Sequence, residues 1–169
     1  VGGIAIADAS ITYVDTSGSA GTAWTAAYTP AAGDTDGTVT YSIAFSDLAG
    51  NAGTAVTSST DSSAVTFDKT APTMTITSTT SGVSTGTTTN DTNIALTFTS
   101  SKATTNFVEG GITVSGGTLS AFNATSPTVY TATFTPTGSG TAVQQVTTID
   151  VAGSVFTDGV GNNNTAATQ

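Results

Sequence analysis

The sequence contains no cysteine and no histidine. The absence of cysteine excludes disulfide bonds. The absence of both residue types removes the thiolate and imidazole groups that act as nucleophiles, general bases and zinc ligands. We therefore expect a protein that is not an enzyme. We expect its stability to come from a packed core, with bound metal as a further contribution.

Charged residues are scarce, at 8% of the chain, and almost all of them are acidic. Lys69 and Lys102 are opposed by eleven aspartate and glutamate residues, which gives a formal net charge of −9. Such a surface repels a phosphate backbone and attracts divalent cations, so we expect no nucleic-acid partner. No apolar run approaches the ~20 residues of a transmembrane helix, and we expect no insertion into a membrane.

Hydrophobic residues make up 37% of the chain, enough for a packed core. No segment has the periodicity of a helix. Apolar and polar residues instead alternate in short stretches separated by glycine, asparagine and aspartate, which is typical of strands joined by turns. Strands are predicted at residues 24–29, 39–45, 73–78, 94–99, 112–115, 130–135, 146–151 and 155–157. Many short strands at this spacing predict an all-β sandwich or barrel.

The sequence contains an internal repeat. WTAAYTP at residues 24–30 returns as YTATFTP at residues 130–136, and FSDLAGN at residues 45–51 returns as FTDGVGN at residues 156–162. The two offsets, 106 and 111 residues, are close to the length of about 100 residues of one immunoglobulin domain. Because two motifs recur in the same order, we infer two copies of one unit. The residues by which the second offset exceeds the first fit a β-bulge near Ala152.

The two copies meet at VTFDKTAPT, residues 65–73. Pro72 lacks a backbone donor and restricts the residue before it to extended conformations, so this segment is interpreted as a short, stiff linker. The sequence thus predicts tandem immunoglobulin-like β-sandwiches, both truncated at their outer ends. Residues 1–70 would be the C-terminal part of one domain without its first strands, and residues 71–169 a domain without its last strand.

Three segments carry a resemblance to a known family. FSDLAGN, then VTFDKTAPT, then TTTNDTNIALTFTSS resemble the bacterial Ig-like tandem repeats of large surface adhesins and biofilm-associated proteins. The resemblance covers nearly the whole chain. It implies a seven-stranded sandwich, an extended array of domains, an extracellular location at the cell surface, and calcium at the domain junctions. The implied partners are neighbouring Ig-like domains of the same chain or identical subunits.

Acidic and amide side chains in the predicted loops offer the oxygen ligands that calcium binds. Strand direction in a sandwich decides at which end of the domain each loop lies. Asp47 and Asn51 would face an upstream neighbour, and Asp91 a downstream one. The alternative is that these residues only form turns, since aspartate and asparagine bond nearby backbone groups. At the junction between the two units we expect five side chains to converge: Asp34, Asp36, Asp68, Asp158 and Asn162.

Three functions fit these patterns. The first is a structural spacer, or stalk, of an extracellular adhesin, made rigid by calcium. The second is a subunit of an extracellular filament, in which residues 3–14, with several apolar side chains, complete the sandwich of another chain. The third is a carbohydrate-binding module with Trp24 and Tyr28 as a sugar-stacking platform, although such a pair on one strand face more often belongs to the core.

Overall fold

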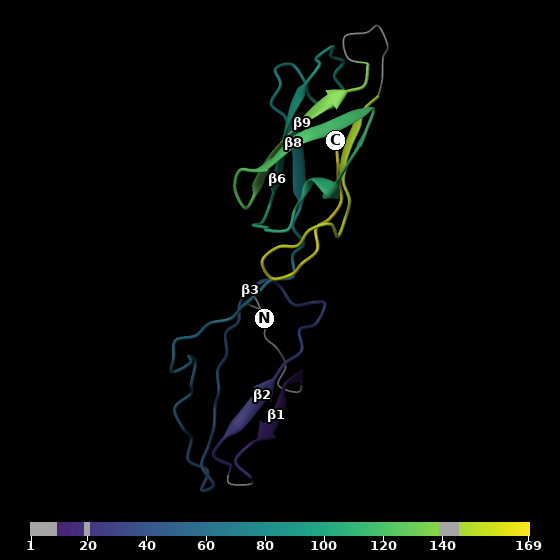
Figure 1. Cartoon of the computed structure of the whole chain (residues 1–169). Helices are drawn as coiled ribbons and strands as arrows, with labels where there is room; N and C mark the ends of the chain where they lie inside the picture. Colours follow the sequence, from purple (N-terminus) through teal and green to yellow (C-terminus); the bar gives the residue numbers. More distant parts are fainter. Residues whose placement is uncertain (1–9, 19–20, 139–145) are drawn as a thin grey trace. The chain divides into compact units, whose positions relative to one another are not determined.

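The computed structural model describes residues 10–18, 21–138 and 146–169. The chain divides into two compact units, unit 1 (Val1–Lys69) and unit 2 (Thr70–Gln169), both visible in Figure 1. The division falls within the segment interpreted as a linker. Within the described ranges, no helix has both the length and the apolar character required to cross a membrane.

The described part of unit 2 contains seven strands in two sheets with antiparallel pairing. In chain order, strands one, two, four and five form the first sheet and strands three, six and seven form the second. This is the strand arrangement of an immunoglobulin constant domain, and the predicted all-β, Ig-like sandwich is confirmed. The first sheet, in the order β5-β6-β9-β8, contains β5 (Met74–Ser78), β6 (Ile94–Ser100), β8 (Gly117–Ala124) and β9 (Val129–Pro136). The second, in the order β11-β10-β7, contains β7 (Ile112–Ser115), preceded by the short helix η2 (Glu109–Gly111), β10 (Thr148–Val151) and β11 (Ala167–Thr168).

Period-two alternation places one face of the first sheet in the core of unit 2. Ile94, Leu96 and Phe98 of β6 are each no more than 8% exposed, whereas the residues between them are exposed or half-buried. In the antiparallel register, Leu96 lies opposite Ala132 and Phe98 lies opposite Tyr130 of β9, which are buried as well. The two central strands therefore form a continuous apolar surface.

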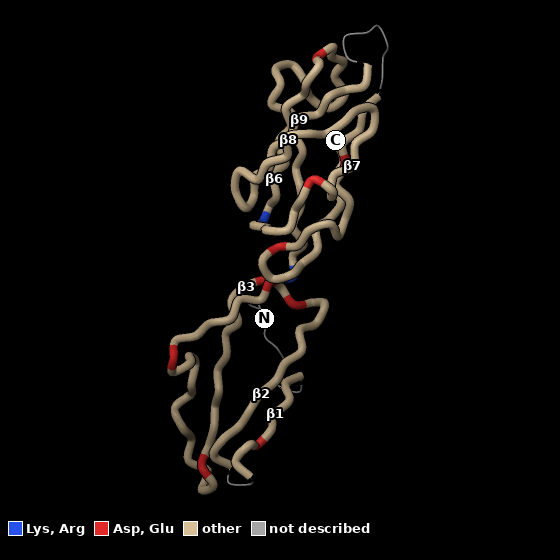
Figure 2. Tube along the Cα trace, viewed as in Figure 1, with Lys and Arg blue, Asp and Glu red and all other residues tan. Residues whose placement is uncertain are grey.

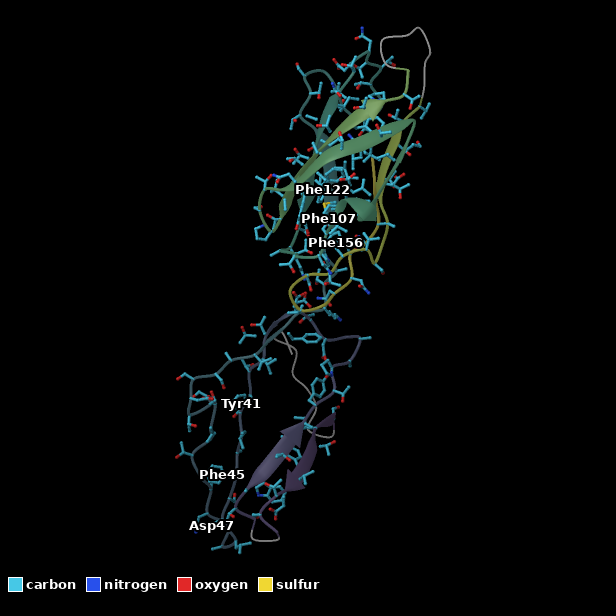
Figure 3. All side chains as sticks on the ribbon, viewed as in Figure 1. Tyr41, Phe45, Asp47, Phe107, Phe122 and Phe156 are labelled. Atoms are coloured by element: carbon cyan, nitrogen blue, oxygen red, sulfur yellow. The ribbon has the colours of Figure 1, made fainter. Side chains whose placement is uncertain are left out.

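Phe107, in the loop before η2, lies at the centre of the core. The centroid of its ring is 5.0 Å from that of Tyr130, 5.2 Å from Phe156, 5.7 Å from Phe122 and 6.1 Å from Phe98. The Phe107 and Tyr130 rings meet at 81°, close to the edge-to-face geometry that aromatic pairs prefer. Figure 3 shows Phe107, Phe122 and Phe156 gathered inside unit 2. One aromatic cluster thus connects the first sheet to the loops that precede β7 and follow β10.

The last strand of the sandwich begins within the chain, at Ala167. The two residues of β11 pair with the last two residues of β10, and the Gln169 N–H continues this ladder by donating to the Ile149 carbonyl at 3.1 Å. The expectation that the second domain lacks this strand is therefore corrected. The expectation assumed that the connection before the last strand is as long in unit 2 as in unit 1. In unit 1 this connection runs over residues 39–65, whereas in unit 2 residues 152–166 suffice.

The described part of unit 1 contains two separate strand pairs. β1 (Thr12–Asp15) forms a hairpin with β2 (Trp24–Ala27), and β3 (Gly37–Thr38) pairs with β4 (Thr66–Phe67). Because β2 carries the repeated motif that β9 carries in unit 2, the β1–β2 hairpin corresponds to the β8–β9 hairpin. By the same alignment, β3 and β4 correspond to β10 and β11. The described part of unit 1 thus contains counterparts of the last four strands of the sandwich.

The predicted strand at residues 39–45 is not continuous. Only single bridges form along it and just beyond it, Ile43 with Val56 and Ser46 with Ala52. A two-stranded ribbon without a packed face is marginally stable at best in water, which explains why a good alternating pattern here does not give regular pairing.

The apolar side chains that the structure describes in unit 1 are largely exposed. Trp24 is 60% exposed, Phe45 55% and Ile43 54%, and within the described ranges the buried hydrophobic cluster belongs entirely to unit 2. Figure 3 shows Tyr41 and Phe45 along the extended segment that leads to Asp47. The expectation that the Trp24 face packs into a core is therefore not met within unit 1.

Candidate functional site: a repeated aspartate turn

The sequence FTDGVGN of unit 2 folds into a tight turn around one carboxylate. Asp158 Oδ1 accepts the backbone N–H groups of Val160 at 3.1 Å and Asn162 at 2.9 Å. Its Oδ2 accepts the Asn162 side-chain amide at 3.0 Å and Lys102 Nζ at 3.2 Å. Gly161 donates to the Asp158 carbonyl at 3.1 Å. Its φ of 95° lies in the left-handed region that favours glycine.

The sequence FSDLAGN of unit 1 forms the same turn. Asp47 Oδ1 accepts the N–H groups of Ala49 at 2.9 Å and Asn51 at 2.8 Å, and Oδ2 accepts the Asn51 side-chain amide at 2.8 Å. Gly50, with φ of 88°, donates to the Asp47 carbonyl at 3.0 Å. Each of these residues lies 111 positions before its equivalent in unit 2.

A single antiparallel bridge closes each turn, Ser46 with Ala52 in unit 1 and Thr157 with Asn163 in unit 2. These bridges are also 111 positions apart. The repeated sequence is thus a repeated hydrogen-bonding pattern. An aspartate is required because two backbone N–H groups and one amide converge on its side chain, and a neutral side chain would accept fewer of them.

Hydrogen bonding favours the ionised form of both turn aspartates. Burial opposes the ionisation of Asp158. The bonds donated by the side chain and backbone of Asn162 and by Lys102 outweigh burial and hold the pKa of Asp158 well below its usual value. The pKa of Asp47 is also lowered, chiefly by the side-chain amide of Asn51 and then by its backbone N–H. The turns are therefore most stable when these carboxylates carry charge.

Lys102 connects the turn of unit 2 to the first residues of that unit. Its Nζ pairs with Asp158 and also donates to the Thr70 carbonyl. The Asp158 side chain is only 3% exposed and that of Lys102 25%, so water and salt screen this ion pair less than one on an open surface. Close by, the Thr165 N–H donates to the Pro72 carbonyl at 3.0 Å. The segment that leads into β5 is therefore held by the loop between β10 and β11, which is the F–G loop of the immunoglobulin arrangement.

Asn164 holds the loop before β11 through its side-chain hydrogen bonds, and the sequence analysis did not identify it. It is 4% exposed. Its Oδ1 accepts the N–H groups of Val155 at 2.9 Å and Phe156 at 3.0 Å, and its Nδ2 donates to the carbonyls of Ala152 and Thr165, both at 2.8 Å. The equivalent residue of unit 1 is glycine, so the repeat gave no signal. Asn164 is one of three consecutive asparagines that are equally suited to a turn, so the sequence did not distinguish it from its neighbours.

Asp34 and Asp36 hold the loop between β2 and β3. Asp34 is 5% exposed and accepts the Tyr28 hydroxyl at 2.8 Å and the Ala31 N–H at 2.7 Å. The Ala31 N–H is the main cause of a lowered pKa at Asp34, and the hydrogen bond to Asp34 raises the pKa of Tyr28. Asp36 Oδ1 accepts the Lys69 N–H at 2.9 Å. Both carboxylates therefore have structural partners within unit 1.

The remaining two predicted ligands lie in separate parts of the chain. Asp68 directly follows β4 at the end of unit 1. Asp91 lies in the loop between β5 and β6, where its Oδ2 accepts the Thr89 hydroxyl. Figure 2 shows that the acidic residues of both units lie mainly on such turns and loops.

The structure brings together two of the predicted pairs, Asp47 with Asn51 and Asp158 with Asn162, through direct hydrogen bonds. Within residues 10–18, 21–138 and 146–169, no three acidic side chains form a group that could hold a metal ion. The predicted convergence at the junction requires residues of both units, and it stays a prediction. The five residues that it involves are Asp34, Asp36, Asp68, Asp158 and Asn162.

Asp158 does not fit the role of a calcium ligand in this arrangement. An ionised carboxylate offers about four lone-pair sites. The carboxylate of Asp158 accepts four hydrogen bonds, one of them from the Lys102 ammonium group. A cation would have to displace these donors. The hydrogen-bonding geometry of this residue is that of a turn.

The comparison with protein families agrees with the fold. The model of a bacterial Ig-like domain matches residues 68–169, which is more than half of the chain and includes every described strand of unit 2. Searches of curated proteins and of solved structures found no match. The fold of the matched family is a structural, non-catalytic one, typical of bacterial surface proteins. The chain therefore belongs to the family of bacterial Ig-like domains.

Proposed function

We propose that this chain is a structural spacer of an extracellular bacterial repeat protein, in which consecutive Ig-like domains form a stalk. The observation that carries the proposal is the aspartate turn, which both units build with the same hydrogen bonds at equivalent positions. A device that recurs from unit to unit serves the array rather than one ligand. The lack of cysteine and histidine supports a function without catalysis.

A spacer has to hold its chain firmly where the chain passes into a domain, and unit 2 does so over several residues. Lys102 holds the Thr70 carbonyl, and the F–G loop holds the carbonyl of Pro72. Thr73 donates to Ser101 Oγ, and the Ser101 N–H donates back to the Thr73 carbonyl, both at 2.9 Å. A pull on this end of the unit would therefore load several hydrogen bonds together.

Rigidity provides the test, and the absence of native cysteine allows clean labelling. Spin labels at Thr25→Cys in β2 and Thr118→Cys in β8 would report the distance between the two units by pulsed electron resonance. A spacer predicts a narrow distance distribution. A distribution as broad as that of a flexible tether would remove the proposal.

We further propose that calcium bound at the junction makes the spacer rigid. The net charge of −9 supports cation binding in general. The hydrogen bonds of Asp158 and Asp47 support a turn role for these two residues, so the prediction depends most on Asp36 and Asp68. Repeating the distance measurement with calcium and with a chelator decides the matter. A calcium joint predicts that the distribution broadens on chelation, and an unchanged distribution would end the calcium hypothesis.

A filament subunit is the second candidate, and one observation favours it. Trp24, Ile43 and Phe45 present apolar surface that no described residue of unit 1 covers, and an exposed strand with such surface can accept a strand from another chain. This function predicts that the chain assembles as its concentration rises. Sedimentation velocity that gives a monomer across the accessible concentration range would exclude it.

A further inference from the structure

The first residues of unit 2 are held by two loops that belong to different sheets. In the loop after β6, Ser101 Oγ accepts the Thr73 N–H and the Ser101 N–H donates to the Thr73 carbonyl, both at 2.9 Å. In the loop between β10 and β11, the Thr165 N–H donates to the Pro72 carbonyl at 3.0 Å. Since β6 lies in the first sheet and β10 and β11 lie in the second, residues 70–73 are attached to both layers of the sandwich.

The side chain of Lys102 connects these two loops directly. Its Nζ pairs with Asp158, in the loop between β10 and β11, at 3.2 Å, and it also donates to the Thr70 carbonyl. An ammonium group has three donors, so one side chain can hold both the entering segment and the opposite loop. We refer to Thr70, Lys102 and Asp158 together as the Lys102 clamp.

Both charged residues of the Lys102 clamp are fixed by their own surroundings. Ser100, 3% exposed at the end of β6, donates its hydroxyl to the Lys102 carbonyl at 2.7 Å. The Asp158 carboxylate accepts three further hydrogen bonds from its own turn. The pair therefore requires little additional ordering, which is the cost that makes most surface ion pairs weak.

The first and last strands of unit 2 lie side by side and run in the same direction. Thr165 contacts Pro72, and two positions further along each segment β11 lies beside β5. Tension applied between Thr70 and Gln169 therefore draws these strands along each other. Contacts between them are then strained together, whereas two strands that are pulled apart at adjacent ends lose their contacts one at a time.

We propose that the Lys102 clamp is the contact that keeps β5 attached to unit 2 when the chain is under tension. Among the described strands β5 pairs with β6 alone, so it is the strand that tension from the linker reaches first. The bonds that Thr73 and Pro72 make are neutral, whereas the clamp is charged, and charge-assisted hydrogen bonds are roughly twice as strong as neutral ones. This inference rests on the proposed spacer function, because a chain that transmits tension needs such a contact.

Single-molecule force spectroscopy of the full chain, held by handles at its two ends, tests the clamp. The length of chain that is released identifies the unfolding of unit 2, and we expect the wild-type unit to unfold in one step. Lys102→Met keeps the length of the side chain and removes its donors. It should add an early step at lower force that releases residues 70–93, which contain β5 and the loop after it. The rate of this release under force should exceed that of wild-type unfolding by about tenfold, the effect of one lost hydrogen bond to a charged group.

A matched control separates the loss of a contact under tension from a general loss of stability. Ile94 is a core residue at the end of β6 remote from Lys102, and Ile94→Val and Ile94→Ala lower the stability of unit 2 without changing the clamp. Of these two variants, the one whose denaturation midpoint is closer to that of Lys102→Met is the control, and it should keep the single step. A single step and equal unfolding rates in the control and in Lys102→Met would overturn the proposal.

A second variant covers the case in which Lys102→Met does not fold. Asp158→Asn keeps the shape of the side chain and removes its charge, so it should add the same early step, and a single step at the wild-type force would overturn the proposal. The spacer function is tested separately by the distance between the spin labels. A narrow distance distribution without the early step in the variants would remove the clamp and leave the spacer. A broad distribution together with the early step would remove the spacer and leave the clamp.

Discussion

Phe45 and Phe156 stand at equivalent positions of the two units, and each accepts the backbone hydrogen bond next to its turn, from Gly53 at 2.8 Å and from Asn164 at 3.0 Å. Their surroundings differ, because Phe156 is 1% exposed and Phe45 is 55% exposed. The turn is made of contacts between residues close in sequence, so it forms in both units. The core needs strands that, in the part of the chain that the structure describes, only unit 2 contains.

This difference predicts a large effect in unit 2 and a small one in unit 1 for the same Phe→Ala substitution. Phe156→Ala leaves a cavity beside Phe107 and should lower the free energy of unfolding of unit 2 by about 3–5 kcal/mol. Phe45→Ala removes a side chain that is already exposed and should change stability by no more than about 0.5 kcal/mol. Urea denaturation followed by circular dichroism measures both. Equal losses in the two variants would contradict the assignment of the core to unit 2.

Asn164 should be the most important asparagine of the F–G loop. Asn164→Ala leaves the N–H groups of Val155 and Phe156 without their acceptor, and a buried unpaired polar group costs about 1–3 kcal/mol. The neighbouring Asn163 is exposed, and Asn163→Ala is the control, with an expected change within about 0.5 kcal/mol. Thermal melting of the two variants provides the comparison. A neutral Asn164 variant would show that the loop is held by other contacts.

The stability of unit 2 should depend on pH through Asp158. Its pKa is lowered in the folded state, so its ionised form contributes stability that is complete above the unfolded-chain value of about 4. That contribution is lost as pH falls from there toward the folded-state value. Melting temperatures between about pH 2 and pH 6 should therefore fall more steeply for the wild-type chain than for Asp158→Asn.

Asn162→Ala supplies the intermediate case, because it removes one donor to the carboxylate and keeps the others. Its melting temperature should depend on pH less than that of the wild type and more than that of the Asp158 variant. An identical pH profile in all three proteins would show that Asp158 is not the group responsible.

Two glycines of the same turn should respond differently to alanine. Gly161 has a φ of 95°, and a Cβ in the left-handed region costs roughly 1–2 kcal/mol. Gly159 has no positive φ, and a Cβ there would meet nothing within 4 Å. Gly159→Ala should therefore be neutral or stabilise slightly by restricting the unfolded chain. Comparing the two denaturation midpoints tests whether the turn has the backbone described.

Much of the fold could be predicted from the sequence, because the apolar alternation survives in the folded strands. The predicted strand at residues 94–99 is β6, and that at residues 130–135 is the interior of β9. The repeat of FSDLAGN and FTDGVGN also predicted two equivalent units, and both form the same turn. Residues 39–45 have an equally good pattern but form no regular strand, because a pattern specifies a face and not the partner that covers it.

The candidate site was less predictable, because its contacts join distant residues. Lys102 and Asp158 are 56 positions apart, and no local pattern connects them. The position equivalent to Asn164 in the first unit is a glycine, so the repeat does not point to Asn164. The sequence indicated which aspartates lie in turns, but it could not show that hydrogen bonds already fill the acceptor sites of Asp158.

Amide hydrogen exchange tests the central claim most directly, namely that the two units are copies of one domain and that, among the described residues, only the second has a buried hydrophobic core. The account predicts that the amides of residues 130–133 exchange slowly, at the rate of global unfolding. The equivalent residues 24–27 should exchange faster by several orders of magnitude. Equal protection of these two segments in the isolated, monomeric chain would contradict it.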